Sequence, residues 1–195
     1  MAKLNRLELL SRDAYATQRE ALCSQAAVHK RARRIGLGEH AVLQFEDRLT
    51  VQQRLHEWLW HSQPREPAAI QFQLDSHNVL IPEGRNLKAT LQFEYTNSAQ
   101  RSTALANLGG IEERIYGEVE GLGRSNAIVE EILVLDESGE PHSVQFLRFE
   151  FSLEQIITVR AGAEFGFGID DDRMRVAHTL KRASRAAVLA DFEPS

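Results

Sequence analysis

The sequence predicts a single α+β domain with a mixed or mainly antiparallel sheet, a long N-terminal helix and a C-terminal helix. Segments in which apolar and polar residues alternate are separated by segments with helical spacing. The chain has 195 residues, 43% of them hydrophobic and 26% charged, as is typical of one globular domain. We therefore expect residues 1–195 to form one domain, on which residues 1–38 pack as a helical arm.

The first helix is expected at 7–34, where alanine and leucine recur at helical spacing. The glycines of 35–38 then suit a helix C-terminus. A second helix at 49–61 places Val51 and Leu55 on one face, and prolines follow it. By the same criteria, further helices are expected at 68–74, 98–108, 153–161 and 179–191.

Alternation of apolar and polar residues predicts the strands, because successive side chains of a strand point to opposite faces. The strands are expected at 40–46, 87–95, 115–120, 127–135, 143–151 and 164–169. Turn-forming residues separate them, as in the Asp-Glu-Ser-Gly sequence of 136–139.

Three of the predicted strands carry the pattern Leu-x-Phe-Glu, at 43–46, 91–94 and 147–150. The second and third copies each run into a predicted helix and then into another strand. This gives two β-α-β-like units and indicates an internal duplication. In every copy leucine and phenylalanine share one face, which we expect to be the core face, and glutamate belongs to the other.

If these strands are neighbours, their glutamates gather with basic residues on one polar face. Carboxylates in a dry place need a cation, a proton or basic partners, so this face predicts a pocket for a polar ligand or a metal. The predicted ligand-binding residues are Glu46, Arg48, Lys88, Glu94, Arg148 and Glu150. The predicted ligands of a divalent metal, the candidate cofactor, are His40, Glu46, Glu94 and Glu150. The alternative is a solvated or salt-bridged sheet face.

The net charge of −5 is distributed unevenly along the chain. Residues 1–34 carry +5, residues 35–172 carry −13 and residues 173–195 carry +3. We expect the basic ends to pack on the acidic middle and neutralise it. The alternative is that the basic segment 29–34 binds nucleic acid, but a short basic run is weak evidence for this.

Several classes of protein and site are excluded by what the sequence lacks. The single cysteine, Cys23, excludes an internal disulfide framework and a zinc site built from thiolates, and it suits a reducing compartment. We expect no membrane span, no secretory signal and a cytoplasmic location. No motif fixes a reaction, so the sequence leaves open whether the chain is an enzyme. Trp60, two residues after Trp58, points away from the apolar helix face, toward either a partner subunit or the helix predicted at 68–74. An exposed Trp60 would favour a homodimer interface, and we expect a homodimer.

Four segments together carry a family resemblance: Phe45-Glu46-Asp47-Arg48-Leu49-Thr50-Val51, the stretch 80–90 that begins Leu-Ile-Pro-Glu-Gly, and the segments 146–150 and 185–191. They resemble an uncharacterised bacterial family, the domain-of-unknown-function 3501 family, over nearly the whole chain. The family pattern tends to show Tyr-Asn where this chain has His77-Asn78.

The resemblance implies no established activity. The family's genes tend to lie near a rubrerythrin-type iron protein and an iron–sulfur oxidoreductase, which implies a link to redox or peroxide metabolism and such iron proteins as partners. Our leading hypothesis is therefore a cytoplasmic accessory or ligand-binding protein in that metabolism. One alternative is a metal-dependent or small-molecule enzyme that uses a carboxylate and histidine pocket. A weaker alternative is a nucleic-acid binder.

Overall fold

The computed structural model describes residues 1–64, 66–131 and 144–192. Its helices are η1 (Arg6–Glu8), α1 (Arg12–Ala32), α2 (Arg48–Ser62), α3 (Pro67–Asn78), α4 (Ser98–Asn107), η2 (Ile111–Arg114), α5 (Leu153–Arg160) and α6 (Arg182–Leu189). None of the described helices combines the length and the apolar character needed to cross a bilayer.

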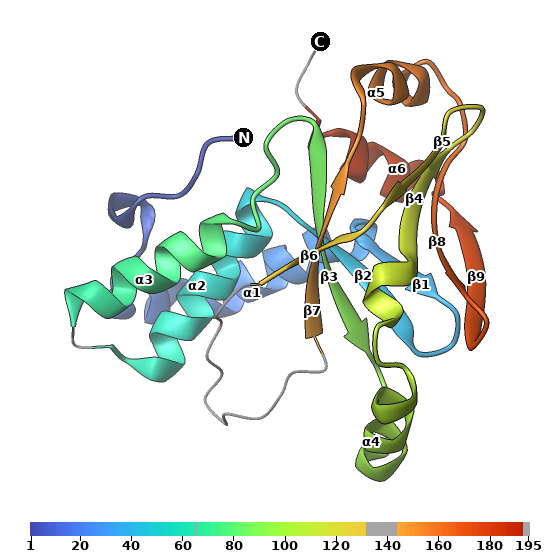
Figure 1. Cartoon of the computed structure of the whole chain (residues 1–195). Helices are drawn as coiled ribbons and strands as arrows, with labels where there is room; N and C mark the ends of the chain where they lie inside the picture. Colours follow the sequence, from blue (N-terminus) through green and yellow to red (C-terminus); the bar gives the residue numbers. More distant parts are fainter. Residues whose placement is uncertain (65, 132–143, 193–195) are drawn as a thin grey trace.

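The described strands form two antiparallel sheets that lie face to face (Figure 1). Sheet A has the order β1 (Arg34–Leu37), β2 (Ala41–Glu46), β3 (Asn86–Phe93), β7 (Val144–Glu150) and β6 (Ile128–Glu130). Sheet B has the order β5 (Gly123–Asn126), β4 (Ile115–Val119), β8 (Phe165–Asp171) and β9 (Met174–Thr179). The predicted α+β class, with a long N-terminal helix and a C-terminal helix, is confirmed.

The main hydrophobic core lies between the two sheets. Leucine and phenylalanine of each Leu-x-Phe-Glu copy belong to this core, as the alternation predicts. The ring of Phe167 in sheet B lies 4.7 Å from that of Phe45 and 5.2 Å from that of Phe149, measured between centroids. Aromatic contacts of this kind hold the two sheets together beyond simple burial of apolar area.

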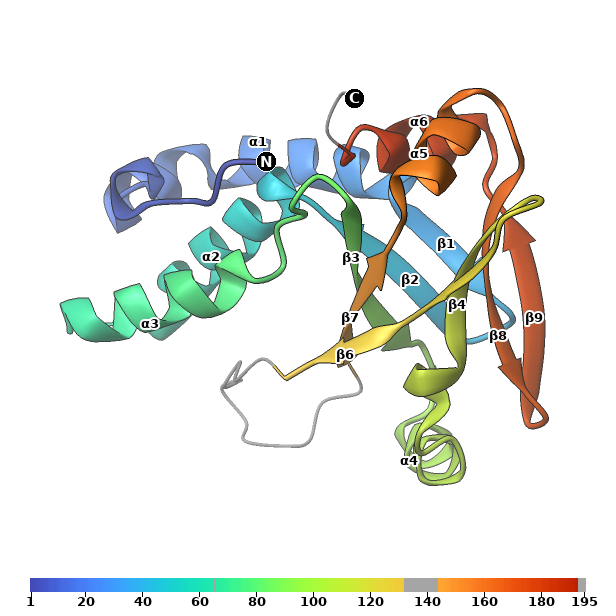
Figure 2. The same cartoon turned by 45° about the horizontal axis from the view of Figure 1, so that its top comes forward.

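A separate layer of helices, formed by α1, α2 and α3, lies on the other side of sheet A and extends away from it (Figure 2). A smaller apolar cluster holds this helical layer together. Its members come from the N-terminal segment, α2, α3 and the turn after α3; they are Leu4, Val51, Leu55, Leu74, Leu80 and Ile81. The face of sheet A turned toward these helices therefore lies outside the main core.

The two predicted β-α-β-like units are present, and each connects the two sheets. One runs from β3 through α4 to β4, and the other from β7 through α5 to β8. Because β3 pairs with β7 and β4 pairs with β8, the two units lie side by side with antiparallel strands. The repeated sequence thus corresponds to a repeated path through the fold.

Three strands were absent from the sequence prediction. The glycines of 35–38, interpreted there as a helix end, belong to β1 and its turn, and Gly38 adopts a φ of 84° that favours glycine. The short strands β5 and β9 complete sheet B. Of the strand predicted at 127–135, β6 is observed, while 132–135 and the turn at 136–139 lie outside the described residues.

The outer face of sheet B requires glycine at position 168. A Cβ atom there would lie 2.5 Å from the carbonyl oxygen of Val176 and against the ring of Tyr116. We predict that Gly168→Ala lowers the free energy of unfolding by about 1–3 kcal/mol through overpacking. The control is Gly109→Ala, where an added Cβ meets nothing within 4 Å. Urea unfolding that finds equal stability for the two variants would contradict this packing.

Candidate functional site

The three strands that carry Leu-x-Phe-Glu are neighbours in sheet A, in the order β2, β3, β7. The strand register places Glu46 opposite Lys88 and Lys88 opposite Arg148. Since these residues alternate with core residues, their side chains point to the face of sheet A that the helical layer covers. A row of charges therefore crosses the sheet where an apolar surface is usual.

Glu46 is fully buried at one end of this row. Its carboxylate pairs with Arg54 of α2 and accepts hydrogen bonds from the hydroxyls of Thr50 and Thr90, each at 2.5 Å. A buried charge is tolerated only when it is paired and hydrogen-bonded. These partners fix α2 on sheet A and leave Glu46 committed to a structural contact.

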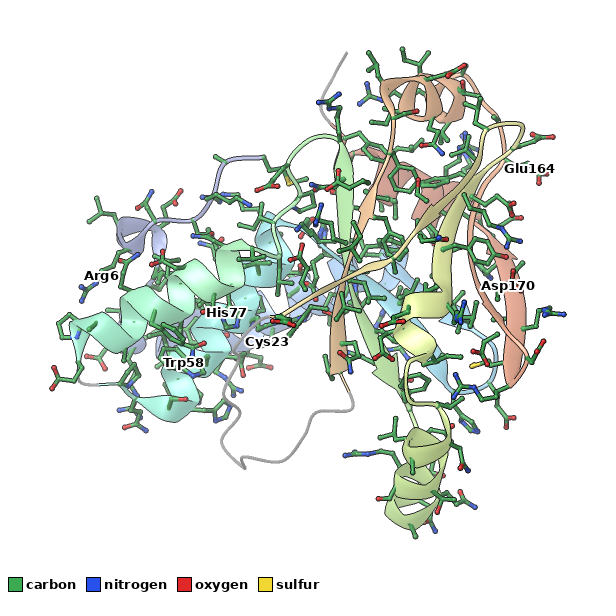
Figure 3. All side chains as sticks on the ribbon, in the orientation of Figure 1. Arg6, Cys23, Trp58, His77, Glu164 and Asp170 are labelled. Atoms are coloured by element: carbon green, nitrogen blue, oxygen red, sulfur yellow. The ribbon has the colours of Figure 1, made fainter. Side chains whose placement is uncertain are left out.

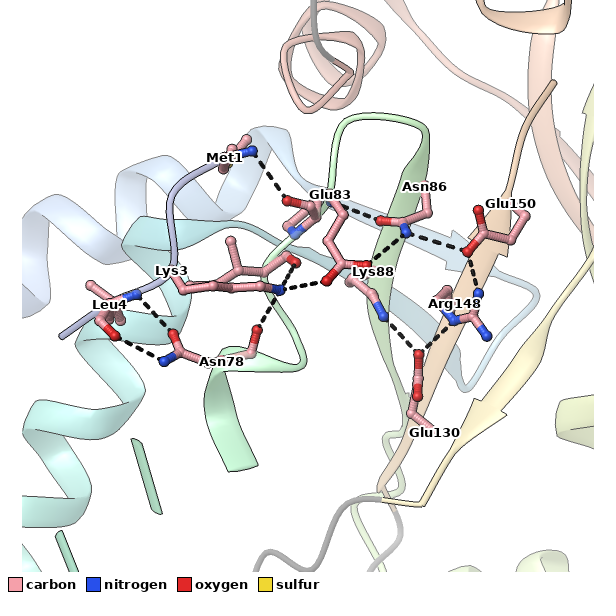
Figure 4. A network of polar contacts seen from close by, with 12 residues as sticks. Met1, Lys3, Leu4, Asn78, Glu83, Asn86, Lys88, Glu130, Arg148 and Glu150 are labelled. Carbon is pink, nitrogen blue, oxygen red and sulfur yellow. Dashed lines mark hydrogen bonds and ion pairs between the residues drawn. The ribbon is translucent and has the colours of Figure 1, made fainter. Parts of the chain in front are cut away.

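Lys88 and Arg148 share one carboxylate in the middle of the row (Figure 4). Lys88 Nζ and Arg148 Nε each donate to Glu130 Oε1, at 2.7 Å in both cases. Glu130 comes from β6, and Arg148 also pairs with Glu150. Of the predicted ligand-binding residues, the structure thus brings Lys88, Arg148 and Glu150 together.

A charged cleft opens above these residues, with a volume of about 380 Å³. The N-terminal segment, the end of α3 and the strands β3, β6 and β7 line it; its residues are Lys3, Asp75, Asn78, Val79, Glu83, Lys88, Glu130 and Arg148. Lys3 pairs with Glu83 at 3.0 Å and donates to the carbonyl oxygen of Asn78 at 2.9 Å. The N-terminal segment is therefore fixed at the mouth of the cleft (Figure 4).

Lys88, Arg148 and Glu130 meet at the inner end of the charged cleft. The side chain of Lys88 is only 3% exposed, and that of Glu130 is 18% exposed. Burial lowers the pKa of Lys88, and its contact with Glu130 offsets this only in part. Burial alone would raise the pKa of Glu130, but hydrogen bonds from Lys88 and Arg148 outweigh it and the pKa lies below its ordinary value. Two cations thus surround one ionised carboxylate.

The structure separates the other predicted site residues from this cleft. Glu94 lies just beyond the opposite end of β3, because β3 runs antiparallel to β2 and β7. There it pairs with Arg34 at 2.5 Å, and its backbone carbonyl contacts the His40 ring. Arg48, at the start of α2, pairs with Glu8 of the N-terminal segment.

The prediction that the three glutamates of the Leu-x-Phe-Glu copies lie together is therefore wrong. Glu46, Glu94 and Glu150 each pair with a different arginine, and Glu94 and His40 lie at the far end of the sheet. Within 1–64, 66–131 and 144–192, no group of three His, Cys, Asp or Glu side chains is placed to hold a metal ion. The four predicted metal ligands do not form a centre.

Two residues of the basic segment 29–34, His29 and Arg33, contact acidic residues of the protein, whereas Arg31 and Arg34 are exposed. Arg33 is 3% exposed and donates two hydrogen bonds to the Asp191 carboxylate, at 2.6 and 2.7 Å. His29 contacts Asp47 at 2.6 Å. These contacts join the end of α1 to α2 and to the chain after α6, so the basic N-terminal segment pairs with acidic residues elsewhere.

Trp60, expected to face either a partner subunit or the helix predicted at 68–74, packs against α1 within the helical layer. Its ring lies 6.5 Å from that of Tyr15, edge to face, and the guanidinium groups of Arg12 and Arg19 lie over it. Figure 3 shows the neighbouring Trp58 and His77 in the same layer. The position of Trp60 thus gives no support to the homodimer, which stays a prediction.

Glu130, Lys3 and Glu83 were missing from the predicted site. Glu130 was within reach of sequence analysis, because alternation in the strand predicted at 127–135 puts it on the face of Ile128, opposite Val129. No local signal pairs that strand with β7. Lys3 and Glu83 meet through a separation of 80 residues, which no spacing rule detects.

His77 lies in the last turn of α3 and is only 1% exposed. Burial lowers its pKa to about 4, its Nδ1 contacts the carbonyl oxygen of Gln73 at 2.8 Å, and Arg54 lies nearby. The unfolded chain takes up a proton at the ordinary pKa of 6.5, whereas the folded chain does not until about pH 4. The contribution of neutral His77 to stability is therefore lost as the pH falls through this window.

We predict that between about pH 7.5 and about pH 5 the wild type loses about 2 kcal/mol of unfolding free energy relative to His77→Gln. Asp191, whose pKa burial raises to about 6, changes stability in the opposite sense, but it does so in both proteins and cancels in the difference. Urea unfolding at the two pH values measures the effect. The same pH dependence in both proteins would show that His77 is not held neutral.

The comparisons with known proteins agree with this fold. A crystal structure described as a novel protein of unknown function from Burkholderia pseudomallei matches with a TM-score of 0.90 and 35% sequence identity, over 98% of this chain and 100% of that chain. No curated protein matches. The model of the family "Protein of unknown function (DUF3501)" matches residues 3–192. The chain therefore belongs to the DUF3501 family.

Proposed function

We propose that the protein is a cytoplasmic ligand-binding protein and that its charged cleft takes a small organic anion, with a carboxylate or phosphate group at the inner end. The observation that carries the proposal is the sharing of one half-buried carboxylate, Glu130, by Lys88 and Arg148. Arg148 also pairs with Glu150, but the side chain of Glu150 is 46% exposed and does not line the cleft, whereas that of Lys88 is 3% exposed. An anion at the inner end would give Lys88 and Arg148 a further partner inside the cleft.

Unused hydrogen-bond donors support an anionic ligand. The Lys88 ammonium has three protons and one acceptor, Glu130, among the described residues. Arg148 directs Nε to Glu130 and Nη1 to Glu150, and its Nη2 has no hydrogen-bond partner in the described part of the chain. Charge-assisted hydrogen bonds to a carboxylate or phosphate are the strongest that such donors form.

The residues at the mouth of the charged cleft indicate which groups the other end of the ligand would carry. Asp75 on α3 and Glu83 present carboxylate oxygens there, whereas the Asn78 side chain bonds the backbone of Leu4. A ligand anchored by its anionic end would therefore direct hydroxyl or other hydrogen-bond donors toward the mouth. The volume of about 380 Å³ is in the range of small-molecule sites.

We predict that glycolate, a small hydroxy acid used as the probe, binds the wild type in isothermal titration calorimetry. Arg148→Met should weaken binding on the order of tenfold or more, because a charge-assisted hydrogen bond contributes about 1.5–3 kcal/mol. Arg101→Met, on the exposed surface of α4, is the matched control and should bind as the wild type does.

Circular dichroism establishes that each variant is folded before binding is compared. Equal affinity of wild type and Arg148→Met for glycolate, or a wild type that binds neither glycolate nor inorganic phosphate, would reject the charged cleft as an anion site.

The link to redox or peroxide metabolism rests on the family resemblance, and we propose it as the setting in which the ligand-binding protein acts. A purified rubrerythrin-type iron protein from the same bacterium should co-elute with this protein in size-exclusion chromatography under reducing conditions. The same experiment, read by light scattering, tests the predicted homodimer. Separate elution of the two proteins would count against the accessory role.

A further inference from the structure

We propose that Lys88 is a reactive amine that forms a Schiff base with a small aldehyde or ketone carrying a carboxylate. The inference rests on the proposed function, because Arg148 would hold the carboxylate while Lys88 meets the carbonyl carbon. Both residues donate to the same oxygen of Glu130. They therefore lie close enough to engage adjacent carbons of one short ligand.

Lys88 combines the features that make a lysine nucleophilic. Its side chain is 3% exposed, yet it lines a cleft that a small molecule can enter. Burial lowers its pKa, and the neighbouring Arg148 acts in the same direction. Desolvation and a nearby cation are the means by which enzymes activate lysine for carbonyl chemistry. A lysine that served only as an ion-pair partner would need no opening toward the cleft.

Glu130 is placed to move the protons that the reaction requires. The Lys88 ammonium first loses one proton through Glu130 to solvent. The neutral amine adds to the carbonyl carbon, a C–N bond forms and the carbonyl electron pair passes to oxygen. Glu130, whose Oε1 lies 2.7 Å from Nζ, takes the two remaining N–H protons in turn and returns both to that oxygen. The oxygen leaves the carbinolamine as water while the nitrogen electron pair forms the C=N bond. The step needs no oxidant or reductant.

The chain offers an internal comparison, since its other lysines are Lys3, Lys30 and Lys181. We would incubate the folded wild type at neutral pH with glyoxylate, an aldehyde with a carboxylate, and reduce it with cyanoborohydride. The hydride converts an imine into a stable carboxymethyl amine, and trypsin then fails to cleave after a modified Lys88. Mass spectrometry should find on the order of tenfold more adduct on Lys88 than on any other lysine, because Arg148 would hold the carboxylate of the aldehyde beside Lys88.

Two variants test whether the adduct forms on Lys88. Lys88→Met should lose the dominant adduct, and Lys181→Arg, at the exposed start of α6 and outside the cleft, should retain it. If Lys88→Met does not fold, the distribution of adduct in the wild type decides alone. Adduct spread evenly over the lysines, or absent from Lys88, overturns the proposal.

Glycolate distinguishes failure of this proposal from failure of the proposed function, because it has the carboxylate and no carbonyl. Glycolate binding without a Lys88 adduct rejects the reactive amine and leaves the anion site intact. A Lys88 adduct that excess glycolate does not suppress confirms the amine and rejects the shared anion site. Absence of both rejects both.

Discussion

The rest of the structure depends on one constraint, namely that the face of sheet A turned toward the helices carries a row of charges. Glu46, Lys88 and Arg148 stand opposite one another on three adjacent strands. A charge at such a position is costly unless a partner meets it. Arg54 of α2 meets Glu46, and Glu130 of β6 meets the two cations. Charge pairing thus determines where α2 and β6 dock, while apolar packing holds the two sheets together.

This division explains why the protein has two hydrophobic clusters. The main core lies between the sheets, and the smaller one joins α2, α3 and the N-terminal segment. The charge row separates these two clusters. At Glu46, two hydroxyl groups and an arginine pair with the carboxylate inside the protein. At Lys88, the helical layer does not cover the row completely, and a cleft remains. Structure and proposed function therefore share the same row of residues, with one end used for packing and the other open to a ligand.

Sequence analysis reached the parts of this fold that depend on local pattern. Alternation identified β2, β3 and β7, and the Leu-x-Phe-Glu repeat correctly assigned their core faces. The prediction for Glu94 was wrong because it ignored strand direction. Each copy of Leu-x-Phe-Glu ends in glutamate, and since β3 runs antiparallel to β2, the glutamate of β3 lies at the opposite end of the sheet. The contact of Lys88 with Glu130 depends on the pairing of β6 with β7, a long-range contact without a local signature. Short strands such as β5, whose four residues are mostly exposed, carry too little alternation to be detected.

The open end of the charge row, at Lys88 and Arg148, is the proposed anion site. A crystal structure of the protein grown with glycolate is the decisive test of this site. We expect the glycolate carboxylate within hydrogen-bonding distance of Lys88 Nζ and Arg148 Nη2, with Glu130 still between the two cations. A charged cleft that holds only water at saturating glycolate, or glycolate bound elsewhere on the protein, would contradict it.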